Sequence, residues 1–322
     1  MAMPPLPAEL VTPRHLNNRV AARVMLDLTV YIAGPSEQEL EFLLSLYERY
    51  CPPERMRQYK IAELEYWVPL AQPVLTASGR AAAAKGIQRP WLEPVRQRIR
   101  AGRALELQFW DGRTIDDPQG SWHFSCRRIH LRSSGLHGFV RILLPLETDL
   151  SILKRMAVEI ADNVRLYSGH GGLVFTYDPW VKEGAFESIY ALARRYWGVG
   201  VEDLNGTLPM MKKGIKGPSW ITLVGSGFAA APKIRSALAM LANRQDVGVA
   251  QRQFATLLLA GAHPVPGDQH RPDASLNGCI AIAQALAPIM IDAHPDFAGG
   301  KFVDHGNTVG WLRRFIEPEG WR

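Results

Sequence analysis

The sequence predicts an α+β fold, with two packed halves of mixed, largely antiparallel sheet and flanking helices. Segments with the two-residue alternation of strands and segments with the apolar periodicity of helices both occur along the 322 residues. They do not follow the regular βαβ order of a parallel sheet. Successive strand-like segments in the first half favour antiparallel pairing, and a Gly-rich break at residues 167–172 separates the two halves.

This break sets the expected domain boundaries. Residues 1–22 form a flexible Pro-rich lead-in, residues 23–166 the N-terminal α+β half and residues 167–322 the C-terminal α+β half. A chain of this length can form one large domain or two ordinary ones. Its 47% hydrophobic and 21% charged residues are typical of a soluble globular protein with ample material for a core.

The N-terminal half begins with a strand at residues 23–32. Ser36 and Glu39 match a capping box, in which each side chain accepts a hydrogen bond from the other residue's backbone amide. The helix behind them has one apolar stripe and ends at residues 51–53, since Pro cannot continue the hydrogen-bond ladder. That stripe consists of Leu40, Leu43, Leu44 and Tyr47.

The elements that follow are shorter. A second strand is expected at residues 59–68, and the Ala-rich segment around residues 81–84 is either a helix or a mobile connection. A basic helix at residues 90–100 ends at Gly102. Residues 105–110 alternate as a half-buried strand.

Two further strands and a helix complete the N-terminal half. In residues 122–131 the apolar phase changes by one residue, which indicates a β-bulge. Residues 139–146 are nearly all apolar, as in a central strand. Asp149 can cap the next helix, whose apolar stripe extends to Val164.

In the C-terminal half a strand begins at residue 173, and a helix with Phe186 and Trp197 on its apolar face ends at Gly198. A strand at residues 220–224 and a helix that begins at Pro232 follow. The remaining segments are strand-like sequence at residues 247–259, a helix from Ser275 to about residue 291, and a tail at residues 292–322 that we expect to be irregular.

Neither targeting signals nor cysteine patterns point outside the cell. No segment approaches the ~20 apolar residues that span a bilayer, and the N-terminus lacks the pattern of a secretory signal. Cys51, Cys126 and Cys279 are far apart, which argues against a disulfide scaffold or a zinc site. A cytoplasmic location is therefore expected.

The chain carries a net charge of +6, with basic clusters at residues 89–103, at residues 127–132 and at residues 212–216. This balance leaves a nucleic-acid-binding protein as one alternative. Nucleic acid is nevertheless disfavoured as the partner, because the sequence has no RNP-type aromatic motif, no zinc finger and no long basic arm. The ordinary interpretation of the clusters is a solvated surface.

Motifs for catalysis are weak. Residues 169–172 (Gly-His-Gly-Gly) could cradle an anion, but Gly-rich turns are common for backbone reasons alone. Ser226 between two glycines lacks the GxSxG spacing of a nucleophile elbow. Histidines and aspartates of the C-terminal third, foremost His294 and His305, match no known metal spacing. An enzyme with a His/Asp loop site is the second alternative, and we expect neither catalytic residues nor a metal nor a cofactor.

The loop at residues 212–218 is the best candidate for a binding site. Lys212, Lys213 and Lys216 place three ammonium groups there, and Met211 and Ile215 add apolar material. Apolar anchors within a charged rim are typical of protein interfaces. The competing interpretation is that the apolar side chains point into the core while the lysines are merely solvated.

The surrounding segment, residues 195–225, resembles a family signature. The residues concerned are Tyr196-Trp197-Gly198, Asp203-Leu204, Leu208-Pro209 and Gly214–Gly225. They are similar to those of bacterial type VI secretion immunity proteins whose cognate toxins carry a VRR-type nuclease domain. The similarity extends from about Arg23 to the C-terminus and is weakest between residues 69 and 89. Trp197 and Trp220 fall on inward-facing positions, so the signature is expected to be structural.

The resemblance implies a cytoplasmic, non-enzymatic immunity protein that binds and inhibits a nuclease effector by occluding its active site or its DNA-binding cleft. A basic chain is poorly suited to mimic DNA. A lysine could instead pair with the carboxylates that hold the toxin's metal, a charge-assisted contact. Lys212, Lys213, Ile215, Lys216 and Met211 are the expected partner-binding residues.

Overall fold

The computed structural model describes residues 3–16, 19–62, 67–70, 92–101, 103–112, 122–129, 137–177, 182–271, 276–297 and 299–321. The Ala-rich segment at 81–84 and the proposed helix start at Ser275 lie outside these residues. So do Arg89 and Arg132 of the basic clusters.

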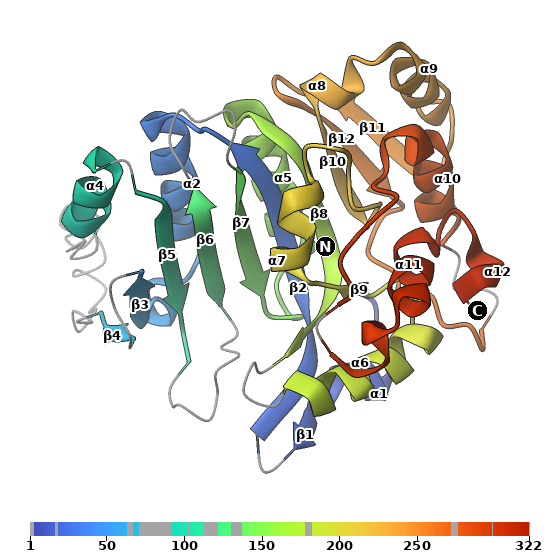
Figure 1. Ribbon diagram of the computed structural model, residues 1–322, viewed down its shortest axis with the longest axis horizontal. Helices are drawn as coiled ribbons and strands as arrows, with labels where there is room; N and C mark the ends of the chain where they lie inside the picture. The colour runs from blue at the N-terminus through green and yellow to red at the C-terminus, as the bar shows by residue number, and fades with distance from the viewer. Residues whose placement is uncertain are drawn as a thin grey trace.

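Twelve strands among the described residues form a single sheet, in the order β11-β12-β10-β8-β2-β7-β6-β5-β3-β4, with β1 on β2 and β9 on β8 (Figure 1). Every pair is antiparallel except β8–β9. The predicted α+β class with a largely antiparallel sheet is thus confirmed. The strands are β1 (Arg14–Leu16), β2 (Arg19–Ala33), β3 (Gln58–Ile61), β4 (Val68–Pro69), β5 (Leu105–Trp110), β6 (His123–Ile129), β7 (His137–Leu144), β8 (Leu166–Tyr177), β9 (Gly200–Val201), β10 (Ile221–Gly225), β11 (Val247–Gln251) and β12 (Ala255–Ala260).

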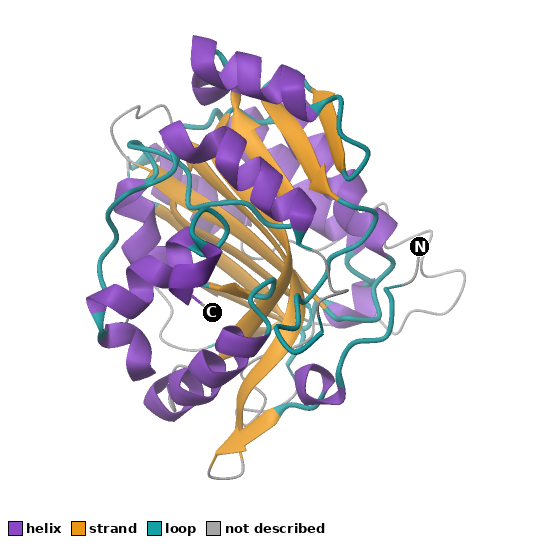
Figure 2. Cartoon of the chain, turned by 90° about the vertical axis from the view of Figure 1, so that its right-hand side faces the viewer, coloured by secondary structure: helices purple, strands orange, loops and turns teal. Residues whose placement is uncertain are grey.

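Helices cover both faces of this sheet (Figure 2). They are α1 (Ala8–Val11), α2 (Glu37–Tyr50), α4 (Leu92–Arg100), α5 (Leu150–Asn163), α6 (Lys182–Arg195), α7 (Leu204–Thr207), α8 (Ser226–Ala229), α9 (Pro232–Leu241), α10 (Asn277–Leu286), α11 (His305–Arg313) and α12 (Pro318–Trp321), with short 3-10 turns η1 (Pro53–Arg55), η3 (Leu208–Met210), η4 (Ala287–Ile289) and η5 (Gly300–Val303). In the described part of the chain, no helix has the length and apolar character needed to cross a membrane.

The central strand β2 has two different faces. Leu26, Leu28 and Val30 belong to the main apolar core, which also contains the buried stripes of α2 and α5. The alternate residues, Asp27 and Thr29, point to the other face, because successive side chains of a strand alternate. Both polar side chains are nonetheless buried, so segments from later in the chain must cover them.

The predicted capping box at the start of α2 is confirmed. The Glu39 amide donates to Ser36 Oγ at 3.2 Å, and the Ser36 amide donates to Glu39 Oε2 at 2.7 Å. Glu39 also accepts from Arg165, through the backbone amide at 2.9 Å and through the guanidinium at 3.1 Å. One carboxylate therefore joins the first turn of α2 to the chain between α5 and β8.

The Gly-rich segment at 169–172 is not a loop, contrary to the prediction. β8 is continuous from Leu166 to Tyr177 and pairs with β2 and β10, so the strand also runs across the expected boundary between the halves at 166/167. The glycines allow close packing. A Cβ on Gly171 would lie 2.9 Å from the carbonyl oxygen of Asp27, and one on Gly169 would lie 2.9 Å from that of Thr29.

Three other predictions can be compared with the structure. The bulge is confirmed, since β5 residues 105 and 107 pair with β6 residues 129 and 126. The single strand predicted at 59–68 is wrong, because β3 and β4 pair there antiparallel as separate strands. The prediction of an irregular C-terminal tail is also wrong. Residues 300–321 contain η5, α11 and α12, and bury Trp311 and Trp321 completely or nearly so.

The Glu39 contacts predict a pH-dependent stability. Burial alone would raise the pKa of Glu39, but hydrogen bonds from Arg165 and Ser36 lower it to about 2. A lowered pKa stabilises the fold above the unfolded value of about 4.3, and this stabilisation is lost as the pH falls toward 2. We expect Glu39→Gln to lower the free energy of unfolding at pH 7 by about 1–2 kcal/mol, since the exposed Arg165 is screened by solvent.

Urea denaturation at several pH values measures this effect. The difference between Glu39→Gln and the unmodified protein should shrink below about pH 4 and vanish near the folded pKa. Glu37→Gln, an exposed change in the same helical turn, is the control. A pH-independent difference for Glu39→Gln would contradict the assignment.

The close packing of β8 gives a second prediction. Gly171→Ala should lower the free energy of unfolding by about 1–3 kcal/mol, because the new methyl group would collide with the β2 backbone. Gly227→Ala is the matched control, since a Cβ there meets nothing within 4 Å. Equal stabilities of the two variants would contradict the close β2–β8 contact.

Candidate functional site: a buried ion network

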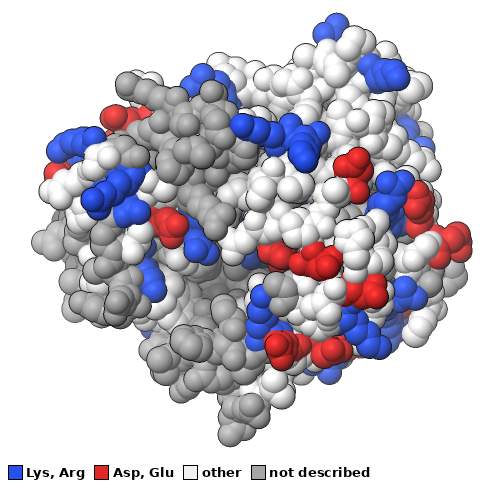
Figure 3. Space-filling view, viewed as in Figure 1, with Lys and Arg blue, Asp and Glu red and all other residues white. Residues whose placement is uncertain are grey.

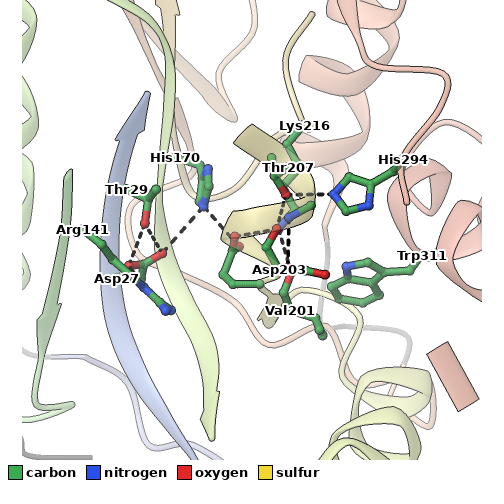
Figure 4. A network of polar contacts seen from close by, with 12 residues as sticks. Asp27, Thr29, Arg141, His170, Val201, Asp203, Thr207, Lys216, His294 and Trp311 are labelled. Atoms are coloured by element: carbon green, nitrogen blue, oxygen red, sulfur yellow. Dashed lines mark hydrogen bonds and ion pairs between the residues drawn. The ribbon is translucent and has the colours of Figure 1, made fainter. Parts of the chain in front are cut away.

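Five charged or titratable side chains form a continuous network on the polar face of β2 (Figure 4). We call this set the buried ion network: Asp27, Arg141, His170, Glu202 and Lys216. Arg141 Nε lies 3.0 Å from Asp27 Oδ1, and His170 Nε2 lies 3.7 Å from Asp27 Oδ2. On its other side His170 Nε2 is 3.1 Å from Glu202 Oε1, and Lys216 Nζ is 2.7 Å from Glu202 Oε2.

Strand register brings Arg141 and His170 close to Asp27. Thr29 of β2 pairs with Arg141 of β7 on one side and with His170 of β8 on the other, so Thr29, Arg141 and His170 share one row of the sheet. Asp27 lies one pleat away on the same face and accepts from Thr29 Oγ1 at 3.1 Å.

The other two members, Glu202 and Lys216, come from the chain segments that lie over this face of the sheet, which we call the covering layer. Glu202 directly follows β9, which pairs with β8 in parallel. Lys216 comes from the chain between η3 and β10, and its ammonium group also donates to the carbonyl of Val201 at 2.7 Å. Lys216 thereby fixes its segment to the end of β9 and, through Glu202, to the sheet.

Burial and neighbouring charges set the protonation of these groups. Burial raises the pKa of Asp27, although Arg141 and His170 act in the opposite direction. For Glu202, burial is outweighed by the charges of Lys216 and His170, which lower the pKa well below its usual range. Burial lowers the pKa of Lys216, and Glu202 opposes that shift. Each carboxylate therefore has a cationic side chain as its partner.

Three of these side chains also have the composition of a metal site. Ligand atoms of Asp27, His170 and Glu202 lie within 4.8 Å of one another, the one such cluster among the described residues. A cation there would compete with Arg141 and with the ammonium group of Lys216, which already neutralise the two carboxylates. The adjoining cavity, of about 30 Å³, has room for about one water. The donor set therefore fits an ion-pair network better than a metal centre.

The network continues into the C-terminal segments. Thr207 Oγ1 is 2.9 Å from His294 Nε2, and burial lowers the pKa of this histidine. Arg314, beside the same cavity, stacks on Trp311 with its guanidinium carbon 3.5 Å from the ring centroid. Its Nε donates to the carbonyl of Trp197 at 2.7 Å. The C-terminal tail, which was predicted to be irregular, thus completes the covering layer.

The structure divides the five predicted partner-binding residues. Lys212 and Lys213 are exposed. Met211 is fully buried against Tyr31 and its neighbours, and Ile215 is buried with its backbone bonded to Ile289 and Ile291. Lys216 belongs to the buried ion network. An interface on this surface can therefore contain Lys212 and Lys213, whereas the other three residues shape the loop.

The histidines singled out in the sequence do not converge on one site. His294 is buried beside Thr207, whereas the exposed His305 lies 2.7 Å from Asp296. The network itself was missed, although it left a signal. Asp27 and Thr29 are spaced by two in an otherwise apolar strand, which places two polar side chains on the same buried face.

The signature tryptophans are structural, as predicted, since Trp197 and Trp220 are 4% and 3% exposed. The family model described as "Type VI immunity for VRR-NUC" matches residues 86–315. The chain belongs to this family. The match includes four members of the network, from Arg141 to Lys216, but not Asp27.

A solved structure supports the fold assignment. A T6SS protein of Pseudomonas aeruginosa superimposes with a TM-score of 0.69 at 18% sequence identity, covering 94% of this chain and 88% of that chain. At this identity the likeness establishes a shared fold. No curated protein matches the chain.

The Lys216–Glu202 pair predicts a strong effect on stability. Lys216→Met should lower the free energy of unfolding by about 3–5 kcal/mol, because it leaves the buried Glu202 carboxylate without its cation. Adding Glu202→Gln should restore part of that loss, which a double-mutant cycle of urea denaturation measures. Lys213→Met, on the exposed neighbour, should change stability by no more than about 0.5 kcal/mol. Additive losses would mean that the two groups do not interact.

Proposed function

We propose that this protein binds and inhibits a cognate type VI secretion nuclease toxin in the cytoplasm of the producing cell. The observation that carries the proposal is membership of a type VI immunity family for VRR-NUC effectors, over residues 86–315. The fold shared with a T6SS protein over nearly the whole chain agrees with it. Inhibition would be steric, by occlusion of the active site or of the DNA-binding cleft.

The exposed basic residues indicate one mode of contact. On the face seen in Figure 3, basic side chains lie over α9 and the chain that precedes β10, whereas acidic and basic side chains are mixed on the left and in the lower right of the view. Lys212 and Lys213 are exposed next to an anchored backbone, since Gly214 and Ile215 are buried. Ammonium groups on a loop whose backbone is hydrogen-bonded to Ile289 and Ile291 suit the carboxylates of a metal-dependent nuclease centre.

The alternative of direct nucleic-acid binding is less well supported. Arg96 lies 3.6 Å from Glu41, and Arg100 lies 3.4 Å from Glu93, so acidic neighbours offset part of the charge of α4. A nucleic-acid-binding protein needs basic groups that remain available to phosphates. Salt-dependent binding of DNA or RNA without the toxin would favour this alternative.

Protection is the direct test. The cognate nuclease is expressed in a sensitive bacterium with and without this protein, and the pair is purified together. We expect growth to be rescued and a stable complex to be recovered. Lack of both rescue and complex with an active toxin would reject the proposal.

A charge-reversal experiment tests the loop. Lys212→Glu combined with Lys213→Glu should weaken toxin binding about tenfold or more, because like charges would then face the toxin's carboxylates. Arg155→Glu with Lys301→Glu makes the same change in net charge at exposed basic residues of α5 and η5, outside the loop and α9. Calorimetric titration of each variant measures the affinity. Equal affinities of the two double variants would remove the loop from the interface.

A further inference from the structure

The strand β11 leaves one side of the sheet open. It is the terminal strand, and among the described residues its outer edge has no strand partner. The Arg252 amide donates to Ala255 at 2.9 Å, and the Gly261 amide donates to Asp246 at 2.9 Å. Because antiparallel bonding alternates along a strand, the backbone groups of Val247, Val249 and Gln251 point away from β12.

The sequence of β11 has none of the features that protect a free edge from pairing with another strand. Residues 247–251 (Val-Gly-Val-Ala-Gln) contain no charge and no proline, and their register with β12 is continuous. Natural sheets usually protect a free edge with one of these devices. The opposite terminal strand, β4, has only two residues, one of which is Pro69. The β11 edge is therefore suited to pair with another strand.

Its sequence is complementary to a second copy of itself. In a two-fold antiparallel pairing centred on Val249, Val249 faces Val249 and Gly248 faces Ala250. This second pair is the narrow, non-hydrogen-bonded kind, with Cα atoms about 4.5 Å apart, which small side chains fit. Gly248 is exposed, and a Cβ at this position would make ordinary van der Waals contacts with Leu259 alone.

Charges at the ends of the strand agree with the same register. Asp246 precedes Val249 by three residues and Arg252 follows it by three, so each faces the opposite charge of the second copy. Within one copy Asp246 pairs with Arg244 at 2.8 Å, and Arg252 pairs with Asp162. Pairing of two copies would join these pairs into rows of alternating sign, with no like charges directly opposite.

We propose that the protein forms a two-fold symmetric homodimer in which the two β11 strands pair antiparallel, centred on Val249. The sheet then continues through both copies. This dimer does not depend on toxin binding, and it leaves Lys212 and Lys213 outside the paired strands.

Cysteine cross-linking tests the register. In the proposed pairing the two Val249 Cα atoms are about 5.5 Å apart, which is within the range of a disulfide. Val249→Cys should therefore give a disulfide-linked dimer on mild oxidation. Gln251→Cys is the control, because its two copies would be offset by four residues, about 13 Å. The native cysteines are all buried, which keeps the background low.

The oligomeric state tests the edge itself. Light scattering after size exclusion should give the mass of a dimer for the unmodified protein and of a monomer for Val249→Pro. This proline removes an outward amide and keeps the bonds to β12. A monomeric unmodified protein would overturn the proposal, as would a dimer that persists in folded Val249→Pro without cross-linking of Val249→Cys. If Val249→Pro fails to fold, the cross-linking result decides.

Discussion

The contacts of Glu202 join the two layers of this protein, because its carboxylate meets His170 on the sheet and Lys216 in the covering chain. On the sheet, Asp27, Arg141 and His170 form a polar cluster where a core would ordinarily be apolar. Such a cluster is stable under a covering chain that supplies matching charges. Glu202 and Lys216 do so, and the same ammonium group fixes its segment to β9 through Val201. The position of Lys212 and Lys213 on the surface follows from this attachment.

Sequence patterns predicted most of the N-terminal half because its elements depend on local signals. The Ser36–Glu39 capping box, the Asp149 cap and the phase change that revealed the bulge in β6 each involve only a few neighbouring residues. Glycines at 169–172 misled the prediction, since their usual role is to allow turns. Here they permit β8 to pack closely between β2 and β10, a requirement that arises only once three distant strands are assembled.

The candidate site was harder to predict for the same reason. Its members come from positions 27, 141, 170, 202 and 216, and only strand register and the parallel pairing of β9 bring them together. Lys216 looked like a surface residue because it lies beside two exposed lysines and two glycines. The C-terminal tail was equally misleading. Its glycines indicated irregular structure, whereas Phe297, Phe302, Trp311 and Trp321 pack together as a core.

The residues of the family signature differ in burial from those that the proposed function assigns to partner contact. The signature residues Trp197, Trp220 and Ile215 are buried, and Lys216 is held within the network, so they specify the fold and the shape of the loop. Buried residues cannot contact a partner directly. Under the proposed function, specificity for a toxin would come from exposed side chains such as those of Lys212 and Lys213, on a backbone that the network anchors. Anchored groups lose less entropy on binding, so a change of partner would require no change in the core.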